Sequence, residues 1–153
     1  MTSLELKIPP LLLVLISAAL MWQLQDFYPL PWLNSLPGLV VAVLLVVAGL
    51  AAVVAGGLAF RRAQTTVDPR YPEQTSQLVT GGIYRLTRNP MYLGMALALA
   101  GWAVYLADVT AFLMLALFIR YMGRYQIGPE ERILLNKFGS EFEQYCAGVR
   151  RWI

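Results

Sequence analysis

The chain contains no histidine, a single cysteine and few charged residues. The missing histidine excludes His-ligated metal sites, histidine general bases and Ser-His-Asp triads, and we expect no metal. Because Cys146 is the only cysteine, no intrachain disulfide can form. Only 14% of the 153 residues are charged, and 58% are hydrophobic. About 25% charged residues are usual in soluble domains, whose surfaces need them, so the composition indicates a membrane protein.

Two long uncharged runs occupy the first part of the chain. The longer one covers residues 36–60 and, at about 1.5 Å per residue in a helix, can cross a bilayer core of about 30 Å. The other covers residues 8–24. A secretory signal peptide is the alternative interpretation of this run, but the acidic Glu5 and the bulky Met21-Trp22 pair are unfavourable for one.

The remaining apolar sequence predicts a helical hairpin in the membrane. Asn89 is a good N-cap and Pro90 a good first helical residue, so one helix is expected over residues 90–106. Asp108 can cap the next helix, over residues 109–126. Each arm is near the lower length limit for a membrane span, so a kinked or re-entrant arm stays open. The predicted fold class is an all-α integral membrane protein with about four transmembrane helices.

Charge predicts the orientation of these helices. In a four-span arrangement all twelve Lys and Arg residues fall on one side, whereas the segments on the other side carry only Asp26 and Asp108. By the positive-inside rule, both termini, the loop 61–89 and a helical tail over residues 127–153 are expected in the cytoplasm. The net charge of +3 then reflects topology, and we expect no nucleic-acid partner. The whole chain, residues 1–153, is predicted to form one membrane domain.

The predicted tail contains two short helices. Pro129 fits the first turn of a helix that runs to about Phe138, and Gly139 suits the position just after its end. A second short helix follows, and Gly148 can end it.

Two polar segments carry motifs of a known superfamily. Residues 82–94, GIYRLTRNPMYLG, resemble the G-x-Y-x-x-x-R-[HN]-P-x-Y-x-G block of a membrane methyltransferase superfamily. Its members include isoprenylcysteine carboxyl methyltransferases and phospholipid N-methyltransferases. Residues 130–145, EERILLNKFGSEFEQY, resemble the C-terminal E-E-x-x-L-x-x-x-F-G-x-x-[YF]-x-x-Y block of the same superfamily. Residues 65–69, TTVDP, are similar to its bacterial branch.

The resemblance implies a membrane methyltransferase that depends on S-adenosyl-L-methionine and has no Rossmann domain. It also implies that the cofactor is held at the cytoplasmic face between the two blocks, and that a lipophilic substrate reaches the methyl group from within the bilayer. The bacterial-type features imply the inner membrane of a bacterium. The positions that match cofactor-binding residues of the family are Tyr84, Arg88, Asn89, Pro90, Tyr92, Gly94, Glu131, Phe138 and Tyr145.

Catalytic roles are assigned to two further residues. Arg124 aligns, by its spacing to the glutamate pair, with a family arginine implicated in holding the substrate, and a guanidinium grips a carboxylate in bidentate fashion. An acceptor that carries a proton would need Glu130 or Glu131 to help remove it, and Glu130 is taken as the catalytic member of the pair.

Several of these residues also have a purely structural interpretation. Arg120 and Arg124 can both extend to lipid phosphates. The paired glutamates can complement the dipole at the start of a helix, and Gly94 can serve helix packing. Phe138 and Tyr145 are as compatible with a hydrophobic core as with the walls of an adenine pocket. The sequence leaves these alternatives open.

The acceptor and the class of function have alternatives as well. The carboxylate of an isoprenylcysteine-like substrate is the leading acceptor, followed by ethanolamine phospholipids and small thiols. A carboxylate needs a cation to position it and no base, whereas an amine or a thiol must lose a proton. A small membrane scaffold subunit without activity would leave both polar blocks unexplained. A reductase with a related membrane fold is a third interpretation, and the oligomeric state is open.

Overall fold

The structure is a computed structural model that describes residues 5–63 and 77–153. Its α-helices are α1 (Pro10–Gln23), α2 (Leu36–Arg62), α3 (Pro90–Leu106), α4 (Val109–Tyr121), α5 (Gly128–Phe138) and α6 (Ser140–Gly148). Between them the described residues also form the 3-10 helices Pro31–Leu33 and Gly82–Arg85 and the π-helix Met122–Ile127. The all-α prediction is confirmed for the described residues. The TTVDP segment at residues 65–69 and Arg70 lie outside them.

Helix α2 is the helix best suited to cross a membrane. It has 27 residues, and its most apolar window has a mean hydropathy of 2.9 with only 22% of the residues buried. No other helix in the described ranges meets the same limits of length and composition, since the apolar α1 and α3 have 14 and 17 residues. One such helix is weak support for a membrane protein on its own, and the four-span arrangement stays a prediction.

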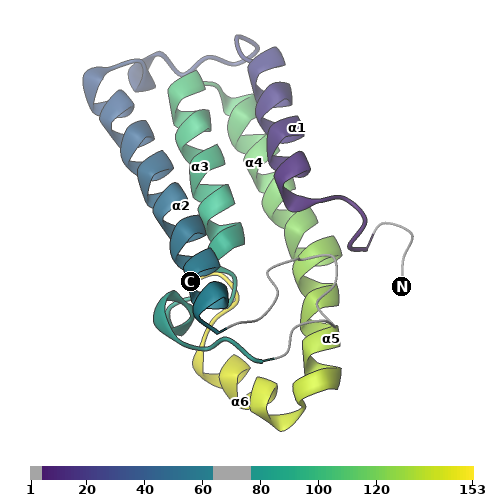
Figure 1. The fold of residues 1–153 in the computed structure, drawn as a ribbon. Coiled ribbons are helices and arrows are strands. Elements are labelled where there is room, and N and C mark those ends of the chain that lie inside the picture. Colours follow the sequence, from purple (N-terminus) through teal and green to yellow (C-terminus); the bar gives the residue numbers. More distant parts are fainter. Residues whose placement is uncertain (1–4, 64–76) are drawn as a thin grey trace.

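Helices α2 and α3 lie side by side because small residues line their contact (Figure 1). A Cβ atom added to Gly94 would lie 2.4 Å from the carbonyl oxygen of Gly49. One added to Gly101 would lie 2.6 Å from the carbonyl oxygen of Ala42. Small residues allow two helix backbones to approach this closely. Gly94 therefore has the packing role that the sequence offered for it as an alternative, and its missing side chain faces α2.

The turn between α3 and α4 is tied to the connection between α1 and α2. Asp108 caps α4 as predicted, because its Oδ1 atom accepts a hydrogen bond from the Thr110 amide at 2.8 Å. Its Oδ2 atom accepts from the Tyr28 amide at 2.8 Å, beside an isolated bridge between Pro29 and Asp108. In Figure 1 these two connections lie at one end of the helices, and α6 lies at the other. The two polar blocks are thereby kept at the end opposite Asp108.

The sequence predicted that the fourth apolar helix ends near residue 126, and the structure differs from this prediction. The chain stays helical from α4 through the π-helix into α5. Pro129 has no amide hydrogen to donate to the Tyr125 carbonyl one turn earlier, and its ring would crowd an ordinary α-helix there. The π-helix accommodates the proline by a wider turn. The Tyr125 carbonyl accepts a hydrogen bond from the Leu6 amide instead, at 3.0 Å. The N-terminal segment thus stabilises the π-helix.

The tail folds back beneath the apolar helices. Helix α5 ends at Phe138 as predicted, and Gly139, with a φ of +52°, turns the chain into α6. Glycine adopts a positive φ without the clash that a Cβ atom would cause. Helix α6 ends at Gly148, also as predicted, and buries Phe142. Beyond α6, Trp152 packs against the hydrophobic core formed by α1, α3 and α4.

Candidate active site

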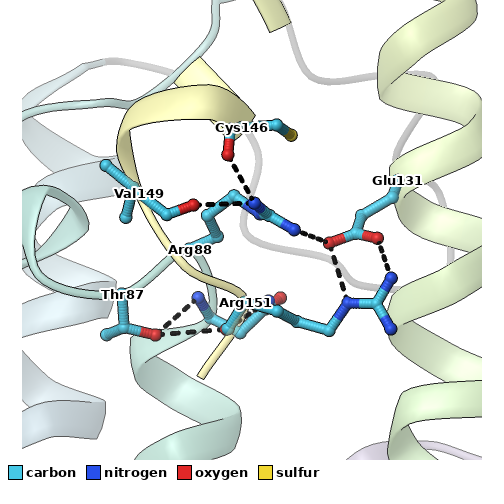
Figure 2. Close-up of polar contacts among 7 residues, drawn as sticks. Thr87, Arg88, Glu131, Cys146, Val149 and Arg151 are labelled. Atoms are coloured by element: carbon cyan, nitrogen blue, oxygen red, sulfur yellow. Dashed lines mark hydrogen bonds and ion pairs between the residues drawn. The ribbon is translucent and has the colours of Figure 1, made fainter. Parts of the chain in front are cut away.

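The two sequence blocks meet at the end of the helices that carries α5 and α6. The first block supplies the start of α3 and the 3-10 helix before it, and the second supplies α5, α6 and the segment after them. Figure 2 shows the polar contacts that join them. Four of the predicted residues lie in two groups, Arg88 and Glu131 in one and Tyr92 and Glu130 in the other.

Glu131 is paired with two arginines, Arg88 and Arg151 (Figure 2). Its Oε1 atom accepts a hydrogen bond from Nη2 of Arg88 at 2.8 Å. Arg151 binds both carboxylate oxygens, through its Nη2 to Oε2 and through its Nε to Oε1 at 3.1 Å. The side chains of Glu131 and Arg88 are 18% and 14% exposed, whereas that of Arg151 is 42% exposed. We call these three residues the ion-pair cluster.

Arg88 also holds the segment that follows α6. Its Nη1 donates to the carbonyl oxygens of Val149 at 2.7 Å and Cys146 at 3.2 Å, and its amide donates to the Arg150 carbonyl at 3.0 Å. Its Nε is buried and has no hydrogen-bond partner among the described residues. Arg88 therefore joins both blocks and keeps one donor for a further acceptor.

Asn89 stands just before α3, as predicted for an N-cap, but its side chain does not cap the helix. Its Nδ2 donates instead to the Arg151 carbonyl at 3.0 Å, and its amide donates to Oγ1 of Thr87 at 3.1 Å. The Thr87 hydroxyl donates to the same Arg151 carbonyl at 3.3 Å. The side chains of both residues thus fasten the C-terminal segment to the first block.

Glu130 belongs to a separate, more buried group that we call the carboxyl–phenol cluster. Its Oε1 atom accepts hydrogen bonds from the Tyr92 hydroxyl at 2.5 Å and from Nε2 of Gln126 at 2.6 Å. Glu130 as a whole is only partly buried, but Tyr92 and Gln126, which surround its carboxyl, are buried. Burial raises the pKa of Glu130 to about 7, although the two hydrogen bonds act in the opposite direction. This carboxyl is suited to hold or release a proton near neutral pH.

Two tyrosines link α6 to the 3-10 helix before α3. The Tyr145 hydroxyl donates to the Tyr84 carbonyl at 2.7 Å, and the Tyr84 ring meets Phe60 edge-on, with 5.5 Å between the ring centroids. Burial raises the pKa of Tyr84 well above its usual range and that of Tyr145 to about 12. Both phenols therefore stay neutral, as the apolar or aromatic wall of a site requires.

The other predicted residues lie outside the two clusters. Arg124 is exposed on the π-helix, 5.9 Å from the centroid of the Tyr125 ring, and no hydrogen bond or ion pair in the described part of the chain joins it to either cluster. Phe138 is partly exposed at the end of α5. Pro90 is buried at the start of α3, and Gly94 faces α2. Cofactor contact stays a prediction for every one of these residues, and Gly94 in addition packs against α2.

Three residues in or beside the clusters were not assigned a role from the sequence: Thr87, Gln126 and Arg151. Gln126 precedes Glu130 by four residues, a spacing that brings side chains together on a helix and could have indicated the contact. Arg151 lies close to the second motif along the chain, but its partner is 20 residues away. No local pattern indicates that pairing.

Comparison with known proteins identifies the family. The model of the phospholipid methyltransferase family matches residues 37–141. A probable protein-S-isoprenylcysteine O-methyltransferase of Oryza sativa subsp. japonica is 32% identical over 118 residues, which are 77% of this chain and 60% of the rice protein. The protein-S-isoprenylcysteine O-methyltransferase of Schizosaccharomyces pombe is 34% identical over 68 residues, 44% of this chain and 29% of that protein.

A shorter relative and the solved structures give less information about the family than these matches do. An uncharacterized protein of Haemophilus influenzae is 40% identical over 63 residues, which are 41% of this chain and the whole of that protein. No solved structure matches the chain. The chain spans only 60% of the length of the rice relative, so activity and substrate do not transfer directly. The family match, however, includes the first block and the glutamates of the second, and the chain therefore belongs to the phospholipid methyltransferase family.

Proposed function

We propose that this protein is a membrane enzyme that transfers a methyl group from S-adenosyl-L-methionine to a lipophilic acceptor at the cytoplasmic face of a bacterial inner membrane. The observation that carries the proposal is the meeting of the two motif blocks in two adjoining clusters, one of ion pairs and one around a buried carboxyl. An inactive scaffold would not need a carboxyl with a pKa of about 7 beside an ion-paired one. The family match supports the same reaction class.

The chemistry of the ion-pair cluster fits the proposed cofactor. The bound cofactor would supply an electrophilic methyl group on a sulfonium. Glu131 would bind its ammonium group or its ribose hydroxyls, and Arg88 has a buried, unpartnered Nε that can donate to its carboxylate. Tyr84 and Tyr145 are neutral and suit an apolar wall. Alignment of two reactants can contribute about 7 to 11 kcal/mol to such a displacement, so this chain need only hold the groups in line and exclude water.

An isoprenylcysteine-like carboxylate is the first proposed acceptor. The names of the rice and fission-yeast relatives support it, because both refer to protein-S-isoprenylcysteine O-methylation. Arg124 would hold the acceptor carboxylate, since it is exposed and makes no ion pair in the described part of the chain. Arg124→Lys keeps the charge but loses the bidentate fork, so we expect turnover to fall far more than cofactor affinity. Arg120→Lys is the matched control, and equal, mild losses in both variants would exclude this role.

An acceptor that must lose a proton is the second candidate, and Glu130 favours it. A carboxyl with a pKa of about 7 is a suitable general base for an ethanolamine amine or a small thiol. A carboxylate acceptor would make no use of this property. The two candidates therefore differ in their predicted dependence on pH.

The test is methyl transfer by the purified protein in detergent with labelled S-adenosyl-L-methionine. An N-acetylated prenylcysteine, phosphatidylethanolamine and a small alkyl thiol serve as acceptors, each assayed between pH 5.5 and pH 8.5. Methylation of the prenylcysteine at a rate that does not follow the ionisation of Glu130 supports the first acceptor. A rate on the amine or the thiol that rises with pH and is lost in Glu130→Gln supports the second. If S-adenosylhomocysteine does not bind and no acceptor is labelled, the proposed function is wrong.

We also propose that the four apolar segments span the membrane with both termini in the cytoplasm. The distribution of Lys and Arg supports this orientation, as does the position of both polar blocks at one end of the helices (Figure 1). A cysteine placed at Asn34 in a Cys146→Ser background should react with an impermeant thiol reagent from the outside. Reaction from the cytoplasmic side alone would contradict the orientation.

A further inference from the structure

We propose that Arg151 is a displaceable internal counter-ion. It holds Glu131 while the site is free of ligand and is replaced there by the cationic group of a bound ligand. This inference rests on the proposed binding of S-adenosyl-L-methionine, whose amino-acid part carries an ammonium group. It assigns a role to a residue that the proposed reaction does not otherwise use.

The two arginines on Glu131 are held very differently. The Arg88 side chain is 14% exposed, and its guanidinium is also bound to the carbonyl oxygens of Val149 and Cys146. The Arg151 side chain is 42% exposed, and in the described part of the chain Glu131 is its one hydrogen-bond acceptor. Of the two cations, Arg151 is therefore the one that can leave without breaking other contacts.

The backbone around Arg151 does not need to move when its side chain leaves. The Arg151 carbonyl accepts from Thr87 and Asn89, and the preceding carbonyl accepts from the Arg88 amide. The next residue, Trp152, packs against the hydrophobic core. A rotation of the Arg151 side chain away from Glu131 would thus open Oε2 of Glu131 while the C-terminal segment stays in place.

Charge explains why a cationic ligand completes the exchange. When Arg151 departs, Glu131 keeps Arg88 on Oε1 but leaves Oε2 open on a side chain that is only 18% exposed. A largely buried carboxylate oxygen without a partner is unfavourable. An ammonium group at this position restores the pairing, whereas a ligand without a cation does not. Because partly exposed ion pairs are weak, we expect the competition by Arg151 to reduce ligand affinity by about two- to fivefold.

The experiment compares wild type, Arg151→Gln and Arg150→Gln in detergent. Arg150→Gln removes the same charge from the exposed neighbouring side chain and is the matched control. Two probes are titrated by calorimetry: S-adenosylhomocysteine, which carries the ammonium group, and 5′-methylthioadenosine, which has the nucleoside but no amino-acid part. Melting temperatures are measured with and without saturating S-adenosylhomocysteine.

We expect Arg151→Gln to bind S-adenosylhomocysteine about two- to fivefold more tightly than wild type and Arg150→Gln do. All three should bind 5′-methylthioadenosine equally. Without ligand Arg151→Gln should melt below wild type, and saturating S-adenosylhomocysteine should narrow the difference. Weaker or unchanged binding of S-adenosylhomocysteine by Arg151→Gln overturns the inference and leaves the proposed cofactor standing. Failure of all three proteins to bind either probe overturns the proposed cofactor and this inference with it.

Discussion

Replacement of Glu130 by glutamine tests the buried carboxyl directly. The Glu130 carboxyl accepts hydrogen bonds from Tyr92 and Gln126, and burial raises its pKa from 4.5 to about 7. The folded protein therefore prefers the protonated carboxyl. Below the unfolded pKa both states are protonated and ionisation has no effect on stability. As the pH rises through the window from 4.5 to about 7, the unfolded state ionises first, and stability is lost.

The magnitude follows from the width of this window. One pKa unit corresponds to about 1.4 kcal/mol, so ionisation of Glu130 should lower the free energy of unfolding by about 3 kcal/mol once the pH is well above 7. Between pH 5 and pH 8 the expected loss is about 2 to 3 kcal/mol. Glutamine keeps an oxygen that can accept both hydrogen bonds but never ionises. The free energy of unfolding of Glu130→Gln, relative to that of wild type, should thus be higher at pH 8 than at pH 5 by this amount.

The measurement is the free energy of unfolding in mixed micelles of a mild detergent and sodium dodecyl sulfate, at several pH values. Glu141→Gln, an exposed change on α6, is the matched control and should follow the wild-type curve. If the curves of wild type and Glu130→Gln run parallel from pH 5 to pH 8, the carboxyl is hydrated and ionised throughout. Glu130 would then not hold a proton near neutral pH, and the second acceptor would lose its support.

Three further predictions concern the contacts that hold the site and the helices. Arg88→Lys should lower the free energy of unfolding by about 3 kcal/mol and expose the C-terminal segment to protease, because lysine cannot bind Glu131, Val149 and Cys146 together. The control Arg85→Lys, at an exposed position, should change neither the stability nor the rate of proteolysis. If Arg88→Lys is as resistant to protease as wild type, Arg88 does not anchor the C-terminal segment. Gly94→Ala should destabilise the protein by about 1 to 3 kcal/mol, since the new Cβ meets the Gly49 carbonyl at 2.4 Å, whereas Gly57→Ala, with nothing within 4 Å, should be neutral in the same denaturation assay. Asp108→Asn should lower the free energy of unfolding by about 1 to 3 kcal/mol, because one accepting oxygen becomes an NH₂ group that faces another hydrogen-bond donor. If Asp26→Asn lowers it by as much, Asp108 does not join the two connections.

Helix boundaries were predictable where local chemistry sets them. The range of α3, Pro90–Leu106, and the cap of α4 by Asp108 agree with the prediction, because a proline at a first turn and a carboxylate at a cap act within a few residues. The junction of α4 and α5 was not predictable in the same way. Pro129 lies within the sequence there, but the partner of the freed Tyr125 carbonyl is the Leu6 amide, which is more than one hundred residues away along the chain.

The candidate site shows the same division. The motifs indicated which residues gather, and Arg88, Tyr92 and both glutamates do lie in the two clusters. The motifs did not indicate the partners inside the clusters. Asn89 was expected to cap α3 but binds the Arg151 carbonyl, 62 residues away. Pairings of this kind depend on how the tail folds back, which no local spacing contains.

The helix itself explains why two neighbouring glutamates can have different tasks. Successive residues of an α-helix point about 100° apart, so Glu130 and Glu131 at the start of α5 face different surroundings. Glu131 points to two guanidiniums and is fully paired as a charge. Glu130 points to a phenol and an amide, has no ion-pair partner among the described residues, and has its pKa raised to about 7 by burial. Two carboxyls with such different environments are suited to different roles, one to a cation and the other to a proton. In the proposed reaction, Glu131 would hold the cationic group of the cofactor, and Glu130 would take the proton from an acceptor that carries one.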